Sequence, residues 1–184
     1  MFFTDMKNTG FFIFTGGPGS GKTTVLIKLA EKGYLTVEET GRKIIRNQMK
    51  ICGTAVPWED AERYARLMFL QSVIDFEQHG HIDKPCFFDR GIIDILGYSR
   101  LEKIPVAPEL EEAAGKYRYN KKVFLFPFWE EIYRTDAERR QSHGKAEDTF
   151  HMMKAVYQEY GYQTVTVPCL SPEERAKWII EKIN

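Results

Sequence analysis

The stretch Gly16-Gly17-Pro18-Gly19-Ser20-Gly21-Lys22-Thr23 decides the fold of this chain of 184 residues. It fits the pattern G-x-x-x-x-G-K-[ST], and it lies between an apolar run at residues 11–15 and a segment of helical spacing at residues 22–32. The glycines let backbone N–H groups point toward phosphate oxygens, and the following helix adds its positive end. A turn that merely joined a strand to a helix would not need the Lys-Thr pair. We therefore interpret the stretch as a phosphate-binding loop.

The loop suggests roles for individual residues. Lys22 is expected to reach the β- and γ-phosphates of ATP or a related nucleotide, and the Thr23 hydroxyl is expected to ligate Mg²⁺. Thr24 is expected to hydrogen-bond to the α-phosphate. The expected nucleotide-binding residues of this region are Gly16, Gly17, Pro18, Gly19, Ser20, Gly21, Lys22, Thr23 and Thr24. ATP and Mg²⁺ are therefore the expected cofactors.

Apolar runs alternate with segments of helical spacing along the chain. The expected strands are residues 11–15, 34–37, 85–88, 122–126 and 162–167. The expected helices are residues 22–32, 40–50, 57–79, 92–102, 109–117 and 146–160, and a last one that starts at Pro172. This alternation predicts an α/β fold of three layers, the αβα P-loop NTPase fold, in which helices cover both faces of a five-stranded parallel sheet.

Charged residues follow the second and third apolar runs, where ligands bind in folds of this kind. Glu38 and Glu39 follow the second run, and Asp89-Arg90 follows the third. A carboxylate there can hold water on Mg²⁺ or accept a proton from the acceptor, while an arginine can bind phosphate. Glu39 and Asp89 are both candidates for the catalytic base, Asp89 is also a candidate metal ligand, and Arg90 is a catalytic candidate. An ion pair between Glu39 and Arg42, or a helix-capping role for Asp89, would explain the same residues structurally.

The segment between the fourth apolar run and the next helix is dense in charge. We expect residues 130–147 to form a mobile lid, in which Arg134, Arg139 and Arg140 close over the phosphates and neutralise transition-state charge. Arg134 and Arg139 are candidate catalytic residues, and Arg140 is a candidate nucleotide-binding residue. A charged surface helix with internal salt bridges is the alternative explanation.

Length, charge and composition narrow the class of protein. A chain of 184 residues is expected to form one domain, residues 1–184. Its formal net charge of +0 argues against a nucleic-acid partner, and no apolar run is long enough to span a membrane. The odd number of cysteines and the lack of a secretory signal predict a cytoplasmic protein. The sequence leaves open whether the chain forms a homodimer.

Several segments together resemble the nucleoside-kinase-like branch of P-loop proteins. They are GGPGSGKTT (16–24), VEETGR (37–42), FFDRGIIDILGY (87–98) and WEEIYRTDAERRQ (129–141). The chain is similar to a family of short predicted ATPases or kinases of AAA type, related in layout to ribosylnicotinamide and deoxynucleoside kinases. The resemblance implies the strand order 2-3-1-4-5, Mg-ATP as donor and an arginine-bearing lid. It also implies that Glu39 contacts or deprotonates the acceptor hydroxyl, and that the adenine ring lies near residues 168–170.

Two functions agree with these features. The leading hypothesis is a Mg-ATP-dependent kinase that transfers the γ-phosphoryl group to a small, nucleoside-like acceptor. The alternative is a nucleotide-binding or nucleotide-hydrolysing switch, an ATPase or a GTPase, without a small-molecule acceptor. Asp94 and Tyr98, one helical turn apart, are candidates for lining an acceptor pocket, although core packing explains Tyr98 equally well. A closed pocket next to Glu39 would favour the kinase, and a wide exposed groove would favour the switch.

Overall fold

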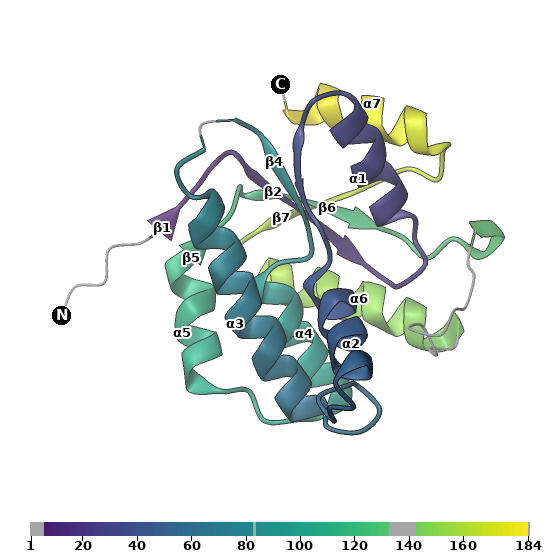
Figure 1. Cartoon of the computed structure of the whole chain (residues 1–184). Coiled ribbons are helices and arrows are strands. Elements are labelled where there is room, and N and C mark those ends of the chain that lie inside the picture. The colour runs from purple at the N-terminus through teal and green to yellow at the C-terminus, as the bar shows by residue number, and fades with distance from the viewer. Residues whose placement is uncertain (1–5, 83, 133–142, 184) are drawn as a thin grey trace.

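The computed structural model describes residues 6–82, 84–132 and 143–183 (Figure 1). Its central sheet is parallel and has the strand order β3-β4-β2-β6-β7. The strands of this sheet are β2 Phe11–Gly16, β3 Leu35–Val37, β4 Cys86–Asp89, β6 Lys122–Phe126 and β7 Gln163–Thr166. In terms of the apolar runs, this order is second, third, first, fourth and fifth. The predicted topology 2-3-1-4-5 is therefore confirmed.

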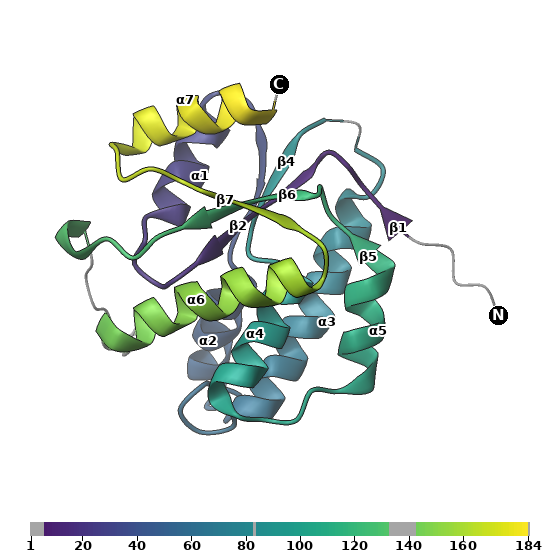
Figure 2. The same ribbon diagram turned by 180° about the vertical axis from the view of Figure 1, so that it is seen from behind.

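Helices cover both faces of the sheet. They are α1 Lys22–Glu31, α2 Thr40–Lys50, α3 Ala61–His79, α4 Ile92–Glu102, α5 Pro108–Lys116, α6 His143–Glu159 and α7 Pro172–Ile183. Helices α1 and α7 pack against each other on one face, whereas α3, α4, α5 and α6 lie on the other, with α2 packed against α3 (Figures 1 and 2). The predicted three-layer arrangement is confirmed.

The central strand β2 is buried on both sides because helices lie on both faces of the sheet. Phe11 and Ile13 belong to one hydrophobic core, and Phe12 and Phe14 belong to the other, as the two-residue period of a strand requires. None of these four side chains is more than 6% exposed. Burial on both faces explains why this strand appears in the sequence as an unbroken apolar run.

Two helix starts differ from the sequence prediction by more than one residue. Helix α3 starts at Ala61 rather than at Pro57, because Asp60 caps the helix by accepting a hydrogen bond from the backbone N–H of Arg63 at 2.9 Å. Helix α6 starts at His143, before the predicted start at residue 146. Both differences move the edge of a helix and leave the order of elements unchanged.

A second, two-stranded parallel sheet pairs β1 Met6–Lys7 with β5 Tyr117–Arg118. The sequence did not predict it, because strands of two residues show no periodicity. Of the segment expected to form a lid, Glu130–Ile132 form the short 3₁₀ helix η1, residues 143–147 belong to α6, and residues 133–142 lie outside the described residues. Within the described ranges, we found no helix with the length and apolarity that a membrane span requires.

Candidate functional site

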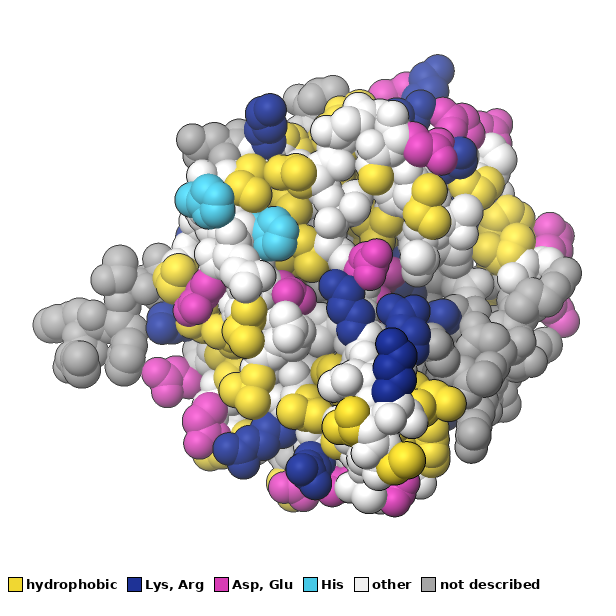
Figure 3. Space-filling model, viewed as in Figure 1, with side chains coloured by type: hydrophobic (Ala, Val, Ile, Leu, Met, Phe, Trp, Pro, Cys, Tyr) yellow, Lys and Arg dark blue, Asp and Glu magenta, His cyan; other side chains and the backbone are white. Residues whose placement is uncertain are grey.

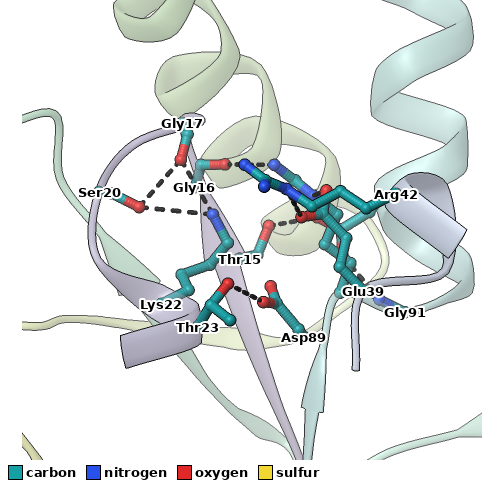
Figure 4. A network of polar contacts seen from close by, with 12 residues as sticks. Thr15, Gly16, Gly17, Ser20, Lys22, Thr23, Glu39, Arg42, Asp89 and Gly91 are labelled. Carbon is teal, nitrogen blue, oxygen red and sulfur yellow. Dashed lines mark hydrogen bonds and ion pairs between the residues drawn. The ribbon is translucent and has the colours of Figure 1, made fainter. Parts of the chain in front are cut away.

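The phosphate-binding loop connects β2 to α1 at the carboxyl edge of the sheet (Figure 4). Gly16 has a φ of 123°, and a side chain at this position would overlap the carbonyl oxygen of Phe126 in β6. A side chain at Gly17 would overlap the carbonyl oxygen of Ala146 in α6. The loop is therefore held between β6 and the first turns of α6, in an approach that only glycine permits.

Lys22 begins α1, and its side chain folds back over the loop. Its Nζ donates hydrogen bonds to the carbonyl oxygen of Gly17 at 2.9 Å and to Ser20 Oγ at 3.4 Å. Burial, together with repulsion from Arg90, lowers the pKa of this amine to about 8 against the attraction of Asp89. The positively charged Lys22 amine thus lies at the centre of the loop, and a phosphate oxygen can replace the Gly17 carbonyl oxygen as its hydrogen-bond acceptor.

Asp89 ends β4 beside the start of α1. Its Oδ2 accepts a hydrogen bond from the Thr23 hydroxyl at 2.9 Å, whereas its buried Oδ1 has no hydrogen-bond partner among the described residues. Burial and the nearby charge of Glu39 raise the pKa of this carboxyl to about 6, against the attraction of Lys22 and Arg90. Asp89 is therefore a buried acid at the loop. It does not cap α4, as the alternative interpretation of the sequence would require, because the N-cap of that helix is Gly91.

Thr23 and Asp89 fit the ligands that a Mg²⁺ ion needs. The ion takes oxygen ligands in octahedral geometry and keeps several waters, so two protein groups beside nucleotide phosphates are sufficient. Asp89 Oδ1 is a buried carboxylate oxygen that the described residues do not satisfy, and an ion or its water would satisfy it. In the part of the chain that the structure describes, no cluster of three or more His, Cys, Asp or Glu side chains offers a metal site.

The Arg90 side chain links the phosphate-binding loop to Glu39, which follows β3, and to Asp94 in α4. Its Nε donates to Glu39 Oε1 at 3.1 Å, and its Nη1 donates to Asp94 Oδ1 at 3.0 Å. Its Nη2 donates to the carbonyl oxygen of Gly16 at 3.2 Å. Although burial opposes its charge, the carboxylates of Glu39 and Asp94 raise the pKa of Arg90 above its usual value. These bonds hold the residue at a φ of 74°, a left-handed conformation that is uncommon outside glycine.

Asp94 anchors this network from the first turn of α4. Its Oδ1 accepts a hydrogen bond from the Thr15 hydroxyl at 2.5 Å in addition to the one from Arg90. Its Oδ2 accepts from the backbone N–H of Gly91 at 2.9 Å and from the Tyr157 hydroxyl at 2.6 Å. The side chain is 3% exposed. Four donors on one buried carboxylate fix its position and, through it, the position of the Arg90 guanidinium.

Glu39 lies between β3 and α2. One of its oxygens accepts from Arg90, and the other, Oε2, lies 3.3 Å from Arg42 Nε. The ion pair with Arg42 that the sequence offered as an alternative is therefore present, together with one to Arg90. Burial opposes the ionisation of Glu39, but the positive charges of Arg90, Lys22 and Arg42 outweigh it and lower the pKa of this carboxyl. The side chain of Glu38, in contrast, is 73% exposed.

A cavity of about 750 Å³ joins these groups. At one end it is lined by residues that follow β6 and β7, and in the middle it runs along the phosphate loop. The first end is lined by Trp129, Ile132, Leu170, Pro172 and Arg175. At the other end, beyond Glu39, lies a space between α2, α3 and α4 that we call the distal chamber. It is lined by Ile45, Trp58, Tyr64, Met68, Ile95 and Tyr98.

Basic side chains gather outside the cavity over α2 (Figure 3). This helix carries Arg42, Lys43, Arg46 and Lys50. Arg42 also lines the cavity, while the other three side chains are exposed. Because the formal net charge of the chain is +0, this is a local positive patch, and it attracts anions toward the mouth of the cavity.

A family model described as an AAA domain matches residues 11–175, from β2 into α7. The chain belongs to the AAA domain family. No curated protein sequence matches this AAA domain. The family assignment agrees with the resemblance that the loop, the strand ends and the lid segment indicate in the sequence.

Solved structures of P-loop kinases share the fold of this AAA domain. Deoxyadenosine kinase from M. mycoides is 12% identical with a TM-score of 0.63, over 95% of this chain and 98% of that chain. Thymidylate kinase from Ehrlichia chaffeensis is 17% identical with a TM-score of 0.59, over 96% and 98%. Shikimate kinase from Acinetobacter baumannii is 16% identical with a TM-score of 0.54, over 94% and 92%. At identities this low, the structural similarity shows a shared fold only.

Sequence reasoning did not predict a role for Arg175 of α7, which lines the cavity of this AAA domain. The residue is 1% exposed, and its Nη1 donates to the carbonyl oxygen of Ser20 at 2.8 Å. Its Nε donates to the carbonyl oxygen of Pro168 at 2.9 Å, and its guanidinium lies 4.6 Å from the centre of the Trp129 ring. Pro-Glu-Glu-Arg at a helix start reads as an ordinary solvated turn, so no local pattern in the sequence marks this contact.

The three arginines of the expected lid, Arg134, Arg139 and Arg140, lie outside the described residues of this AAA domain. Their roles stay predictions. The segment that holds them joins η1 to α6, and α6 is the helix whose Ala146 touches the phosphate loop at Gly17. The start of α6, which follows this segment in the chain, therefore lies against the phosphate loop.

Proposed function

We propose that this AAA domain is a Mg-ATP-dependent kinase that transfers the γ-phosphoryl group of ATP to a small hydroxyl- or phosphate-bearing acceptor, such as a nucleoside. The observation that carries the proposal is the cavity that runs from the phosphate loop past Asp89 and Glu39 into the distal chamber. A protein that only hydrolyses its nucleotide needs no such chamber. The fold shared with deoxyadenosine, thymidylate and shikimate kinases supports the same class of reaction.

The donor phosphates would bind on the loop, where backbone N–H groups, the positive end of α1 and Lys22 meet their charge. Thr23 and Asp89 would hold Mg²⁺, which when bound withdraws charge from the phosphoryl group that is transferred. At neutral pH, most Lys22 amines are protonated and most Asp89 carboxyls are ionised, because their pKa values lie at about 8 and about 6. Both groups therefore carry the charge that the proposal requires.

Glu39 would act as the base toward an acceptor hydroxyl. Its lowered pKa keeps it ionised, so it can accept the hydrogen bond of the hydroxyl. As the acceptor oxygen bonds to the γ-phosphorus, the bond from that phosphorus to the oxygen shared with the β-phosphate breaks, and the hydroxyl proton passes to Glu39. Asp89 fits this role less well, because its Oδ2 already bonds to Thr23 at the cation site.

Arginines would complete the site by neutralising the charge that develops on the transferred group. Arg90 is held by Glu39, Asp94 and the Gly16 carbonyl, so it would present a fixed positive charge beside the γ-phosphate. Arg134 and Arg139 of the predicted lid would add charge when the lid closes, and Arg140 would bind the nucleotide. Closure would also exclude water and so favour transfer over hydrolysis.

A nucleotide-dependent switch, ATPase or GTPase is the competing function. The test measures ADP release by the wild-type protein in the presence of nucleosides, sugars and vitamins, with Lys22→Ala as the control for background hydrolysis. We expect at least one compound to stimulate ADP release, and we expect the stimulation to disappear in Lys22→Ala. Steady ADP release that no compound stimulates would overturn the kinase proposal and support the switch.

A further inference from the structure

The distal chamber has walls suited to a planar ring. Tyr64 and Tyr98 pack edge to face, with ring centres 5.5 Å apart, and both line the chamber together with Ile45 and Met68. Trp58 lies at the chamber and is 42% exposed, which places it toward the mouth. Apolar and aromatic side chains of this kind bind rings through burial and edge-to-face or stacked contacts.

Charged groups at this end of the cavity are matched within the described residues. Glu39 pairs with both arginines that face it, as described above. Lys145 of α6 pairs with Glu102 of α4 at 2.6 Å. An anionic acceptor that took one of these basic side chains as its partner would leave Glu39 or Glu102, whose side chains are 22% and 20% exposed, without that counter-charge, which is unfavourable. An uncharged acceptor leaves the pairs intact.

One polar atom of the chamber has no partner inside the protein. Tyr98 Oη is buried and makes no hydrogen bond within the described residues. Burial, together with the charge of Glu102, raises the pKa of this hydroxyl, so it stays protonated at neutral pH and can donate. Tyr98 lies one turn after Asp94 on α4, which corresponds to a rise of about 6 Å along the helix. Because Tyr98 also lines the cavity, its hydroxyl is a donor for a polar atom of a ligand in the distal chamber.

We infer that the acceptor is an uncharged alcohol that carries a planar ring, and that Tyr98 selects it by donating a hydrogen bond to a polar atom of that ring. This inference rests on the proposed kinase function and narrows it, because it excludes acceptors that carry a phosphate or a carboxylate. Tyr98 is then a specificity residue, and the apolar walls of the distal chamber supply the remaining affinity.

The first test compares each common ribonucleoside and deoxyribonucleoside with its own 5′-monophosphate. Binding is measured by calorimetry without ATP, and transfer is measured by ADP release. We expect at least one nucleoside to bind and to be phosphorylated, and its monophosphate to bind at least about 10-fold more weakly because of the matched charges. Binding or turnover of the monophosphate at equal or higher affinity would overturn the inference and leave the kinase function standing.

The second test uses Tyr98→Phe, with Tyr160→Phe as the matched control, because Tyr160 does not line the cavity. We expect Tyr98→Phe to raise the nucleoside KM by about 10-fold, the effect of one lost hydrogen bond, and to leave the KM for ATP unchanged. The Tm should not fall, because Tyr98 Oη has no partner to lose among the described residues. A Tyr98→Phe variant with a lower Tm and an unchanged nucleoside KM would show a structural tyrosine and overturn the inference.

The two levels of the proposal can fail separately. Nucleosides that bind in a Tyr98-dependent way but are never phosphorylated would overturn the kinase function and support the ligand class of the distal chamber. Phosphorylation only of acceptors that carry a phosphate or a carboxylate would support the kinase function and overturn the inference about the distal chamber. Absence of nucleoside binding in both the wild type and Tyr98→Phe would overturn the inference.

Discussion

The Thr23 hydroxyl donates a hydrogen bond to Asp89 Oδ2 at 2.9 Å, while the other oxygen of the same carboxylate is buried without a partner in the described structure. The two residues come from neighbouring elements, the first turn of α1 and the end of β4. A buried carboxylate oxygen left without a donor is unfavourable in the free protein. We propose that a cation bound between the loop and the strand would satisfy this oxygen.

Removal of the Thr23 hydroxyl should weaken the cation site selectively. Thr23→Val keeps the shape of the side chain but loses the oxygen, so we expect the apparent Mg²⁺ affinity to fall by about 10- to 100-fold. ADP release measured against Mg²⁺ concentration gives this affinity. Thr23→Ser is the matched control, since it keeps the hydroxyl, and equal Mg²⁺ dependence in the two variants would contradict a cation at this position.

The pH dependence of kcat/KM for ATP should be bell-shaped. As the pH falls through about 6, Asp89, whose pKa is raised, takes up a proton and loses its affinity for the cation. As the pH rises through about 8, Lys22, whose pKa is lowered, loses its proton and its attraction for phosphate. In Lys22→Arg the alkaline limb should vanish, because a guanidinium stays charged. If that limb persists in Lys22→Arg, another group causes it.

The hydrogen bonds to Asp94 should contribute measurably to stability. Tyr157→Phe removes one donor and should lower the free energy of unfolding by about 1 kcal/mol. Asp94→Asn replaces an acceptor oxygen by an amide donor among other donors, and should lower it by about 3 kcal/mol. Urea unfolding followed by circular dichroism measures both effects. The exposed Asp148→Asn on α6 is the control, and a loss as large there would show that the Asp94 network is not the cause.

Arg175 should stabilise the phosphate loop through its hydrogen bond to the Ser20 carbonyl oxygen. Arg175→Met removes the guanidinium donor from the Ser20 carbonyl oxygen and from the Pro168 carbonyl oxygen, of which the latter keeps the Leu170 N–H, so we expect the free energy of unfolding to fall by about 3 kcal/mol. We also expect the KM for ATP to rise by about 10-fold, since the loop loses a fixed contact. Lys177→Met removes an exposed cation from the same helix and should change neither quantity. An unchanged KM in Arg175→Met would limit this residue to a role in folding.

The layout of the sheet could be predicted because each of its strands leaves a local signal. Phe11–Gly16 and Lys122–Phe126 are buried on both faces, so they stand out as unbroken apolar runs between helical segments. Their order in the sheet was implied by the family resemblance, and the structure has the same order. The start of α3 was predicted too early, because the apolar and acidic residues before Asp60 resemble a helix start. Strands as short as Met6–Lys7 leave no such signal.

The sequence by itself determined the position of the glycine loop and of the charged residues at the strand ends, since both depend on neighbours along the chain, and the family resemblance implied the strand order. Only the tertiary structure decided which of those residues meet. Arg90 donates to Glu39 and Asp94, which belong to separate elements, and Arg175 near the end of the chain donates to the Ser20 carbonyl oxygen. Tyr98 Oη has no hydrogen-bond partner among the described residues. Hydrogen bonds and pKa shifts depend on distances of a few ångströms and on burial, and the packing of α4 and α7 against the sheet sets both.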